Sequence, residues 1–346
     1  MRCLCLLEHG GPLTVVHRPM PQPMGDEVLV KVAATGLCHT DVHLWRGHYA
    51  LGSGRRLDVK DHGIQTPLVL GHEIAGSVAA GPQELVGRHV LVHPWIGCTR
   101  CPACTGGAEN LCDQPRFLGM HRPGGFSEYV LVPHQRYLVD ITGLDPVQAA
   151  PLACAGLTAF SAIGKLGPAI HDGPVVVVGA GGLGLMAVRL LAMCGTRRVV
   201  AVDIDEAKLQ VAGAAGAHAV VNAAAPDAVK RVRQAAGSAV HAVLELVGSA
   251  SSVSLACAVA GRGAHVVMCG LQGGEMPLSL PLMPLKALTL QGSYVGTLAE
   301  LRELVALVRR HGTAGLHITT RSWDEANEAL TDLQVGRVVG RVVLTP

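Results

Sequence analysis

The chain has 346 residues, of which 49% are hydrophobic and 16% charged, and its formal net charge at pH 7 is +2. This composition excludes a disordered chain, and the balanced charge argues against partners such as nucleic acid or an anionic membrane surface. We expect no membrane-spanning helix and no cleavable signal. With 11 cysteines as well, the chain is predicted to be a cytoplasmic protein of one large or two medium-sized domains.

The N-terminal part of the chain has the pattern of a β-rich domain. Short β-branched runs bounded by glycine, proline or aspartate predict strands at residues 27–33, 74–78 and 88–93. Polar residues stand at the ends of such runs, at 36–41 and 69–73, where functional loops often lie. The polar, glycine-rich stretch 47–66 predicts an exposed loop.

Four cysteines follow, separated by two, two and seven residues: Cys98, Cys101, Cys104 and Cys112. In a reducing compartment such a cluster indicates a metal site rather than disulfides. Tetrahedral thiolate coordination suits Zn²⁺, and a closed shell of four cysteines leaves no position for substrate. An iron–sulfur cluster is the alternative, but the ferredoxin pattern has a last spacer of about three residues and a proline after the final cysteine, and this chain has neither. We therefore expect a structural zinc.

The character of the sequence changes near residue 150. Four valines at 175–178 lead into Gly179-x-Gly181-x-x-Gly184, an apolar helix to about residue 194, and a strand that ends at Asp203. Further strand-like runs at 219–221, 242–246 and 265–268 alternate with helical segments, which indicates a doubly wound parallel sheet covered on both faces. An amphipathic helix at 299–311 and a final strand at 337–344 complete the chain.

The glycine-rich turn predicts a dinucleotide site. Its glycines allow the tight turn, close approach of a pyrophosphate and close helix–strand packing, and the helix N-terminus favours the phosphates. Asp203 stands 24 residues after Gly179, where a carboxylate accepts hydrogen bonds from the adenosine ribose and repels a 2′-phosphate. No arginine follows it, so NAD is favoured over NADP. The alternative role for Asp203 is a helix N-cap.

Three further candidate metal ligands are scattered along the chain, namely Cys38, His72 and Cys154. Two cysteines and a histidine with an open fourth position make a catalytic zinc pattern. Taken singly, each has a simpler explanation, since Cys154 can be a small buried hydrophobe and His72 an ordinary loop histidine. Spacing alone does not show that the three converge.

Taken together, these motifs resemble a known family. The stretches Gly71-His72-Glu73 and Cys38-His39-Thr40-Asp41, the four-cysteine lobe and the glycine turn occur in an order and at separations similar to those of the zinc-dependent alcohol dehydrogenases of the medium-chain dehydrogenase/reductase superfamily. The resemblance covers essentially the whole chain. It implies a GroES-like catalytic domain of residues 1–155, with its zinc lobe at about 95–113, completed by residues 298–346. A Rossmann NAD-binding domain of residues 156–297 would lie between them.

The resemblance also implies roles for individual residues. Cys38, His72 and Cys154 would hold a catalytic zinc, with Glu73 close behind it and Asp41 orienting His72. Thr40 would hydrogen-bond the substrate oxygen, His43 would be the outer end of a proton relay, and Trp95 would wall the substrate pocket. The residues expected around NAD are His39, Thr158, Gly179, Gly181, Gly182, Leu183, Gly184, Asp203, Lys208, Val247 and Arg341.

The implied activity is reversible hydride transfer between a primary or secondary alcohol and NAD, with zinc as a Lewis acid and two zinc ions per subunit. The first alternative is a carbonyl reductase or polyol dehydrogenase of the same superfamily. The second is a non-catalytic protein that binds zinc and cofactor. The family pairs its subunits through the edge of the Rossmann sheet, so residues 288–295 are the expected contact of a tetramer or dimer. The segment 47–66 is longer than the corresponding segment of compact microbial members. Its residues His48, Tyr49 and His62 are expected near the mouth of the substrate pocket. Residues 81–87 are shorter, and Glu245 stands where the family more often has aspartate.

Overall fold

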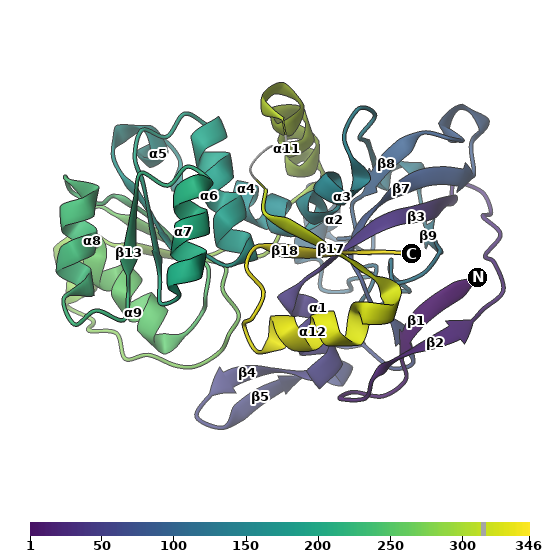
Figure 1. Cartoon of the computed structure of the whole chain (residues 1–346), viewed down its shortest axis with the longest axis horizontal. Helices are drawn as coiled ribbons and strands as arrows, with labels where there is room; N and C mark the ends of the chain where they lie inside the picture. Colours follow the sequence, from purple (N-terminus) through teal and green to yellow (C-terminus); the bar gives the residue numbers. More distant parts are fainter. Residues whose placement is uncertain (313–315) are drawn as a thin grey trace.

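A computed structural model describes residues 1–312 and 316–346 of the chain. Figure 1 shows a β-rich body around β1, β3, β7 and β8 on one side and an α/β body around α6–α9 on the other. The C-terminal elements β17, β18 and α12 lie with the β-rich body, next to the N-terminal strands. No single helix among the described residues is long and apolar enough to cross a membrane. Two consecutive helical segments, 146–153 and 155–166, reach this length and apolarity together, but a bend of 51° separates them.

The β-rich body contains a mixed sheet in the order β10-β8-β7-β3-β18-β17, with β9 also paired to β3, and a small sheet β2-β1-β6. The last strand, β18, pairs antiparallel with β3, so the end of the chain returns to the sheet that its beginning forms. The strands are β1 (Arg2–Leu6), β2 (Leu13–His17), β3 (Val28–Leu37), β6 (Leu68–Val69), β7 (Glu73–Ala80), β8 (His89–Val92), β9 (Tyr129–Val132), β10 (Leu138–Asp140), β17 (Ile318–Ser322) and β18 (Arg341–Thr345).

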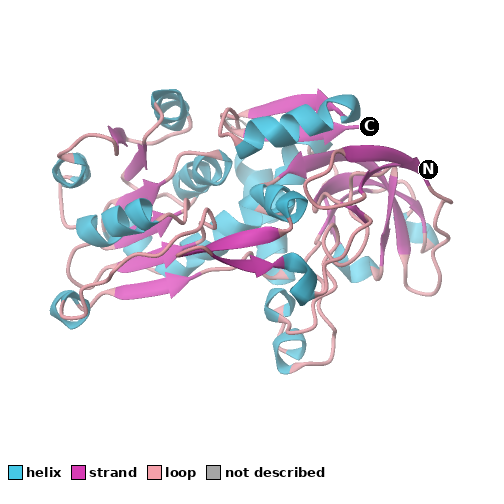
Figure 2. Ribbon diagram, turned by 90° about the horizontal axis from the view of Figure 1, so that it is seen from below, coloured by secondary structure: helices cyan, strands magenta, loops and turns pink. Residues whose placement is uncertain are grey.

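The α/β body is built on a six-stranded sheet in the order β13-β12-β11-β14-β15-β16, and all of its neighbouring strands are parallel. Val175 and Val177 pack into the core on one face of this sheet, and Val176 and Val178 into a separate core on the other. Both faces are therefore covered, as the apolar run of valines predicts. Figure 2 shows these strands with helices on either side. The strands are β11 (Val175–Val178), β12 (Val199–Asp203), β13 (Ala219–Asn222), β14 (Ala242–Glu245), β15 (His265–Met268) and β16 (Thr289–Gly292).

The helix ends follow from local capping chemistry. Asp205 accepts hydrogen bonds from two backbone N–H groups at the start of α7, and Thr297 and Glu300 form a capping box at the start of α11. The helices are α1 (His39–Arg46), α2 (Pro102–Thr105), α3 (Pro146–Ala149), α4 (Ala155–Leu166), α5 (Ala169–Asp172), α6 (Gly182–Met193), α7 (Glu206–Ala214), α8 (Ala228–Ala236), α9 (Ala250–Val259), α10 (Leu282–Lys286), α11 (Leu298–His311) and α12 (Ala326–Gln334).

Two local predictions were wrong. Residues 47–66 are not simply an exposed loop, because β4 (His48–Gly52) and β5 (Arg55–Asp58) form a hairpin before a 3₁₀ turn, Val59–His62. Ser53 and Gly54 have φ of 49° and 72°, the backbone signs of the hairpin turns that match strand twist. The final strand begins at Arg341, not at 337, because Gly340 has a φ of 82° and its backbone lies against His317.

Candidate functional site

Three segments far apart in sequence bring Cys38, His72, Glu73 and Cys154 together, with one ligand atom of each within 4.8 Å of all the others. Cys38 is the N-cap of α1 and Cys154 the N-cap of α4, and their Sγ atoms are 3.9 Å apart. Gly71, just before His72, has a φ of 88°, and a Cβ there would lie 2.5 Å from Phe126 Cδ1. Only glycine allows this turn, which aims His72 at the thiols.

The imidazole of His72 is fully buried, and neither ring nitrogen makes a well-formed hydrogen bond. Its Nδ1 lies 3.4 Å from Oδ1 of Asp41, a buried carboxylate that also accepts hydrogen bonds from the backbone N–H groups of Cys38 and Gly71. A buried imidazole without a partner is costly unless another group completes it. With two thiols facing it, the donor set fits Zn²⁺, and Asp41 is placed to orient the ring.

Glu73 connects this cluster to the glycine-rich turn. Its carboxylate accepts a hydrogen bond from Ala155 N and forms a buried ion pair with Arg341. Burial raises the pKa of Glu73, and the guanidinium of Arg341 opposes that effect. A Cβ on Gly182 would lie 2.5 Å from Arg341 Cδ, so the arginine lies directly beneath the turn expected to hold the pyrophosphate.

The expected relay residues lie on α1 and not in a loop. Asp41 Oδ2 accepts a hydrogen bond from Cys38 N and completes a capping box that starts the helix. Thr40 is half-buried and His43 buried, and their separation of three residues puts them on one face of the helix. His39 is exposed. Burial lowers the pKa of His43 to about 4, and His39 acts in the same direction.

The nucleotide turn has the close packing that its glycines suggest. A Cβ on Gly184 would lie 1.8 Å from the carbonyl oxygen of Gly179, so no side chain fits there. Asp203, at the end of β12, accepts hydrogen bonds from Ala180 N at 2.6 Å and from Ile204 N at 2.8 Å. Asp205 is the N-cap of α7. Asp203 therefore does not cap this helix, which was its alternative role.

The other residues expected around NAD come from several elements of the structure. Val247 lies against Gly179, since a Cβ on that glycine would be 2.6 Å from Val247 Cγ2. Thr158 is buried on the first turns of α4, after Cys154. Leu183 and Lys208 are half-buried, and the ammonium of Lys208 is 3.9 Å from the carboxylate of Asp205.

An aromatic group borders the metal cluster. Trp95 is buried, its indole N–H donates to Ala153 O at 3.1 Å, and its ring centroid lies 5.4 Å from that of His72. The rings of Phe117 and Tyr294 pack edge-on against the same indole ring, with centroid separations of 5.2 and 6.2 Å. Sequence reasoning missed Phe117 and Tyr294, because they reach the site only through tertiary packing and belong to no motif.

The four-cysteine cluster is a separate site. Its Sγ atoms all lie within 4.8 Å of one another, at distances that include 3.5, 3.7 and 4.0 Å. A tetrahedron of sulfurs around Zn²⁺ with bonds of about 2.3 Å has edges of about 3.8 Å. No disulfide is present among the cysteines of the chain, all of which are free. The geometry therefore fits a closed structural zinc.

A buried carboxylate attaches this lobe to the β-rich body. Glu109 accepts hydrogen bonds from Gly97 N at 3.0 Å, from the hydroxyl of Tyr137 at 2.7 Å and from Arg136 at 2.7 Å. On another edge, the side chain of Asn110 donates to Tyr294 O at 2.9 Å, which connects the lobe to the aromatic group.

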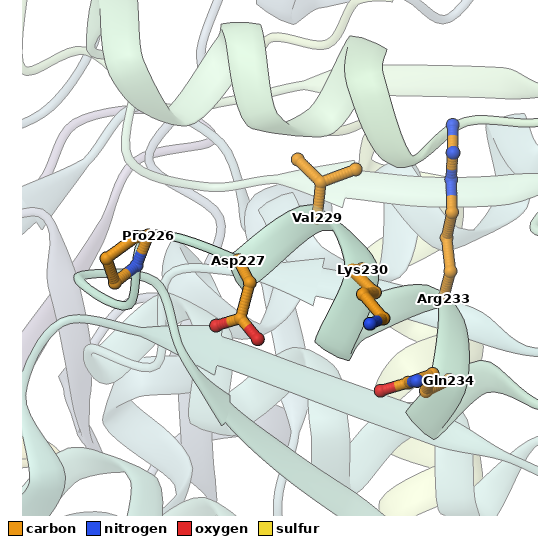
Figure 3. A pocket seen from close by; sticks show the side chains of 6 residues that line it. All are labelled: Pro226, Asp227, Val229, Lys230, Arg233 and Gln234. Carbon is orange, nitrogen blue, oxygen red and sulfur yellow. The ribbon is translucent and has the colours of Figure 1, made fainter.

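A surface hollow of about 520 Å³ lies beside α8. Figure 3 shows the side chains that line it, among them Asp227, Lys230 and Arg233. No residue of either cysteine-containing cluster lines it. It is therefore not part of the candidate site.

Comparison with known proteins agrees with this geometry. The model of the alcohol dehydrogenase GroES-like domain matches residues 24–143, and that of the zinc-binding dehydrogenase matches residues 182–310. An NAD-dependent alcohol dehydrogenase of Sulfurisphaera tokodaii is 37% identical over 351 residues, with 100% of both chains covered. The chain belongs to the zinc-dependent alcohol dehydrogenase family.

Other relatives show the range of this family. An alcohol dehydrogenase of Geobacillus stearothermophilus is 31% identical, with 99% of this chain and 98% of that protein covered. A D-arabinose 1-dehydrogenase (NADP(+)) of Saccharolobus solfataricus is 32% identical, with 99% and 96% covered. The crystal structure of the alcohol dehydrogenase of Aeropyrum pernix superposes with a TM-score of 0.89 at 31% identity, with 100% of both chains covered. The family is therefore certain, and its members differ in substrate and cofactor.

Proposed function

We propose that the chain is a zinc-dependent, NAD-linked alcohol dehydrogenase that interconverts primary or secondary alcohols with aldehydes or ketones. The observation that carries this proposal is the convergence of Cys38, His72 and Cys154, with the imidazole of His72 fully buried and without a well-formed hydrogen bond. We also propose that residues 1–155 and 298–346 form the catalytic domain and residues 156–297 the NAD-binding domain. The pairing of β18 with β3 supports this division.

Cys38, His72 and Cys154 would hold the catalytic zinc, while Cys98, Cys101, Cys104 and Cys112 would hold the structural one. Zinc in the catalytic cluster supplies a Lewis acid for the alcohol or carbonyl oxygen, and NAD accepts or returns the hydride. Glu73 and Arg341 join this cluster to the glycine-rich turn through a buried ion pair, which supports a fixed distance between substrate and cofactor.

Residues of α1 would move the proton. As Thr40 Oγ1 takes the proton of the substrate hydroxyl, it would release its own hydroxyl proton toward the ribose of bound NAD, from which His43 would pass a proton outward. Because burial lowers the pKa of His43 to about 4, its ring is neutral at pH 7, with one nitrogen free to accept a proton as the other gives one up, and it does not retain the proton that it relays. In the reductive direction the same groups return the proton to the product.

The walls of the site favour apolar alcohols over polyols. Trp95 lies beside His72, and Phe117 and Tyr294 pack against Trp95, so this side of the site supplies apolar contact rather than a set of hydrogen-bonding groups. D-arabinose 1-dehydrogenase (NADP(+)) and L-threonine 3-dehydrogenase occur among the relatives at 32% and 33% identity. A polyol dehydrogenase is our second candidate because of these aromatic side chains.

Asp203 supports NAD as the cofactor. Its carboxylate is fixed by backbone N–H groups at the end of β12, where a 2′-phosphate would meet negative charge. We also infer a homo-oligomer, either tetramer or dimer, because Leu280 and Leu285, shortly before β16, are 76% and 68% exposed. A cytoplasmic location suits two clusters of reduced cysteines.

Measurement of nicotinamide reduction with a panel of alcohols and polyols, and of nicotinamide oxidation with aldehydes and ketones, tests this proposal with both NAD and NADP. We expect turnover of apolar alcohols with NAD and weak turnover of polyols. Activity confined to NADP, or to polyols, would contradict the assignment of cofactor or substrate class.

A further inference from the structure

The hairpin formed by β4 and β5 makes a two-stranded sheet of its own, and Figure 1 shows it projecting from the molecule below α1. A two-stranded hairpin by itself is marginally stable in water. Its position in the protein therefore depends on contacts at its two ends, and these contacts involve different parts of the chain.

At its base, the hairpin covers the expected proton relay. The ring of Tyr49 packs at a tilt against the ring of His43, with centroids 4.4 Å apart and planes inclined by 30°. His43 is only 8% exposed. A hydrogen bond from Val59 N to Gly47 O at 3.0 Å fixes the hairpin to the end of α1, the helix that carries His43. Tyr49 thus limits the orientations open to the histidine ring and excludes water from one of its faces.

At its tip, the hairpin contacts the segment that follows β15 in the nucleotide-binding part. The side chains of Ser53 and Arg55 donate hydrogen bonds to the carboxylate of Glu275. The backbones also meet closely, since a Cβ on Gly52 would lie 2.5 Å from Glu275 Cγ and one on Gly273 would lie 2.5 Å from Ala50 O. Glycines on both sides are required for this approach. The two segments border an open hollow of about 430 Å³.

We propose that residues 48–58 form a strap that holds the proton relay in place. In this account Tyr49 is a positioning residue for His43, and contact with Glu275 keeps the strap against the nucleotide-binding part. The inference rests on the proposed role of His43 in the dehydrogenase reaction. It explains why the hairpin contacts both α1 and the nucleotide-binding part, because the contact at its tip adds to the hydrogen bond at its base in keeping Tyr49 over His43.

A double-mutant cycle tests the role of Tyr49, with kcat for the chosen alcohol and the Kd of NAD as readouts. We expect Tyr49→Phe, which keeps the ring, to retain kcat within about twofold. Tyr49→Ala should lower kcat about tenfold, which is within the range of coupling energies between residues in contact, here Tyr49 and His43. The Kd of NAD should not change. In a His43→Ala background, Tyr49→Ala should cause no further loss.

The second arm tests the tip of the strap. Glu275→Gln should lower kcat up to about threefold when His43 is present and not at all when it is absent, since exposed ion pairs contribute little. Glu84→Gln, an exposed glutamate in the β-rich body, is the matched control and should leave kcat unchanged.

The outcomes separate the two proposals. Equal loss from Tyr49→Ala with and without His43 would show that the tyrosine is only a pocket wall and would overturn the strap, while leaving the relay intact. Full turnover by His43→Ala would overturn the relay in the proposed function, and the strap with it.

Discussion

His72 illustrates how a single residue identifies a site. Its ring is fully buried and its nitrogens lack well-formed hydrogen bonds, while two cysteine sulfurs and an aspartate surround it. Asp41 also accepts a hydrogen bond from Cys38 N. One carboxylate therefore both starts α1 and orients the histidine, which explains why Cys38 and Asp41 occur three residues apart.

Asp203 should determine the choice between NAD and NADP. Asp203→Asn removes the charge that repels a 2′-phosphate, and it weakens charged hydrogen bonds that are worth about 1.5–3 kcal/mol each. We expect the KM for NAD to rise about tenfold or more and the preference for NAD over NADP to shrink. Steady-state kinetics with both cofactors measure this ratio.

Asp205→Asn is the matched control for that experiment. Asp205 caps α7, so this change should lower the free energy of unfolding by about 1 kcal/mol or less and leave the cofactor ratio unchanged. An unchanged ratio in Asp203→Asn would show that another residue discriminates between the cofactors.

His93 should make the protein sensitive to acid. It is 1% exposed, its ring nitrogens have no hydrogen-bond partners, and burial lowers its pKa from 6.5 to about 3. As the pH falls through 6.5, the unfolded chain binds a proton that the folded chain does not bind until about pH 3. The free energy of unfolding therefore decreases as the pH falls through this window.

Replacement of this residue should reduce the pH dependence. Between pH 6.5 and about pH 4, the free energy of unfolding of His93→Phe should fall by about 3 kcal/mol less than that of the wild type. Denaturant unfolding at each pH measures this difference. His89→Phe, at the exposed start of β8, the strand that ends just before His93, should retain the wild-type slope. Equal slopes in wild type and His93→Phe would show that His93 does not cause the acid sensitivity.

Residues within motifs could be predicted from the sequence, whereas residues placed by packing could not. The cysteine cluster and the glycine turn have fixed local spacings, so their chemistry is visible in one stretch of chain. Phe117 and Tyr294 approach Trp95 from segments with no common spacing, and only the folded structure brings them together.

At the level of secondary structure, the long apolar and alternating runs were predictable and the short polar ones were not. The helix predicted at 299–311 is α11, Leu298–His311, because its apolar face repeats regularly and its cap is local. By contrast, α1 contains two histidines, a threonine and an aspartate, so its helical pattern was hidden. The β4–β5 hairpin was missed because its turn is Ser53-Gly54 and not the more common Asn-Gly.

The four-cysteine lobe should contribute stability and not chemistry. Cys104→Ser removes one ligand of the structural zinc and leaves Cys38, His72 and Cys154 unchanged. We expect one zinc fewer per subunit and at least about 3 kcal/mol less stability, because loss of a metal is among the few changes with large effects. The folded fraction should still turn over alcohol.

Cys194→Ser provides the control, since Cys194 is a half-buried cysteine outside both clusters. It should bind zinc and unfold like the wild type. Complete loss of turnover in folded Cys104→Ser would show that the lobe takes part in the reaction.

For the whole molecule, the alternation of strands and helices was enough to predict the parallel sheet, and the order β13-β12-β11-β14-β15-β16 is that of a Rossmann fold. The mixed sheet was less predictable, because its strands are short and come from both ends of the chain. The pairing of β18 with β3 puts Arg341 beside Glu73, 268 residues away in sequence. No local pattern encodes that contact.

The central claim is that Cys38, His72 and Cys154 hold the zinc at which an alcohol is oxidised by NAD. The most direct measurement is zinc content per subunit together with NADH formation, for the wild type and for Cys38→Ala. We predict two zinc ions with turnover in the wild type, and one zinc ion with no turnover in a folded Cys38→Ala. Turnover that persists in Cys38→Ala after the loss of one zinc would contradict the account.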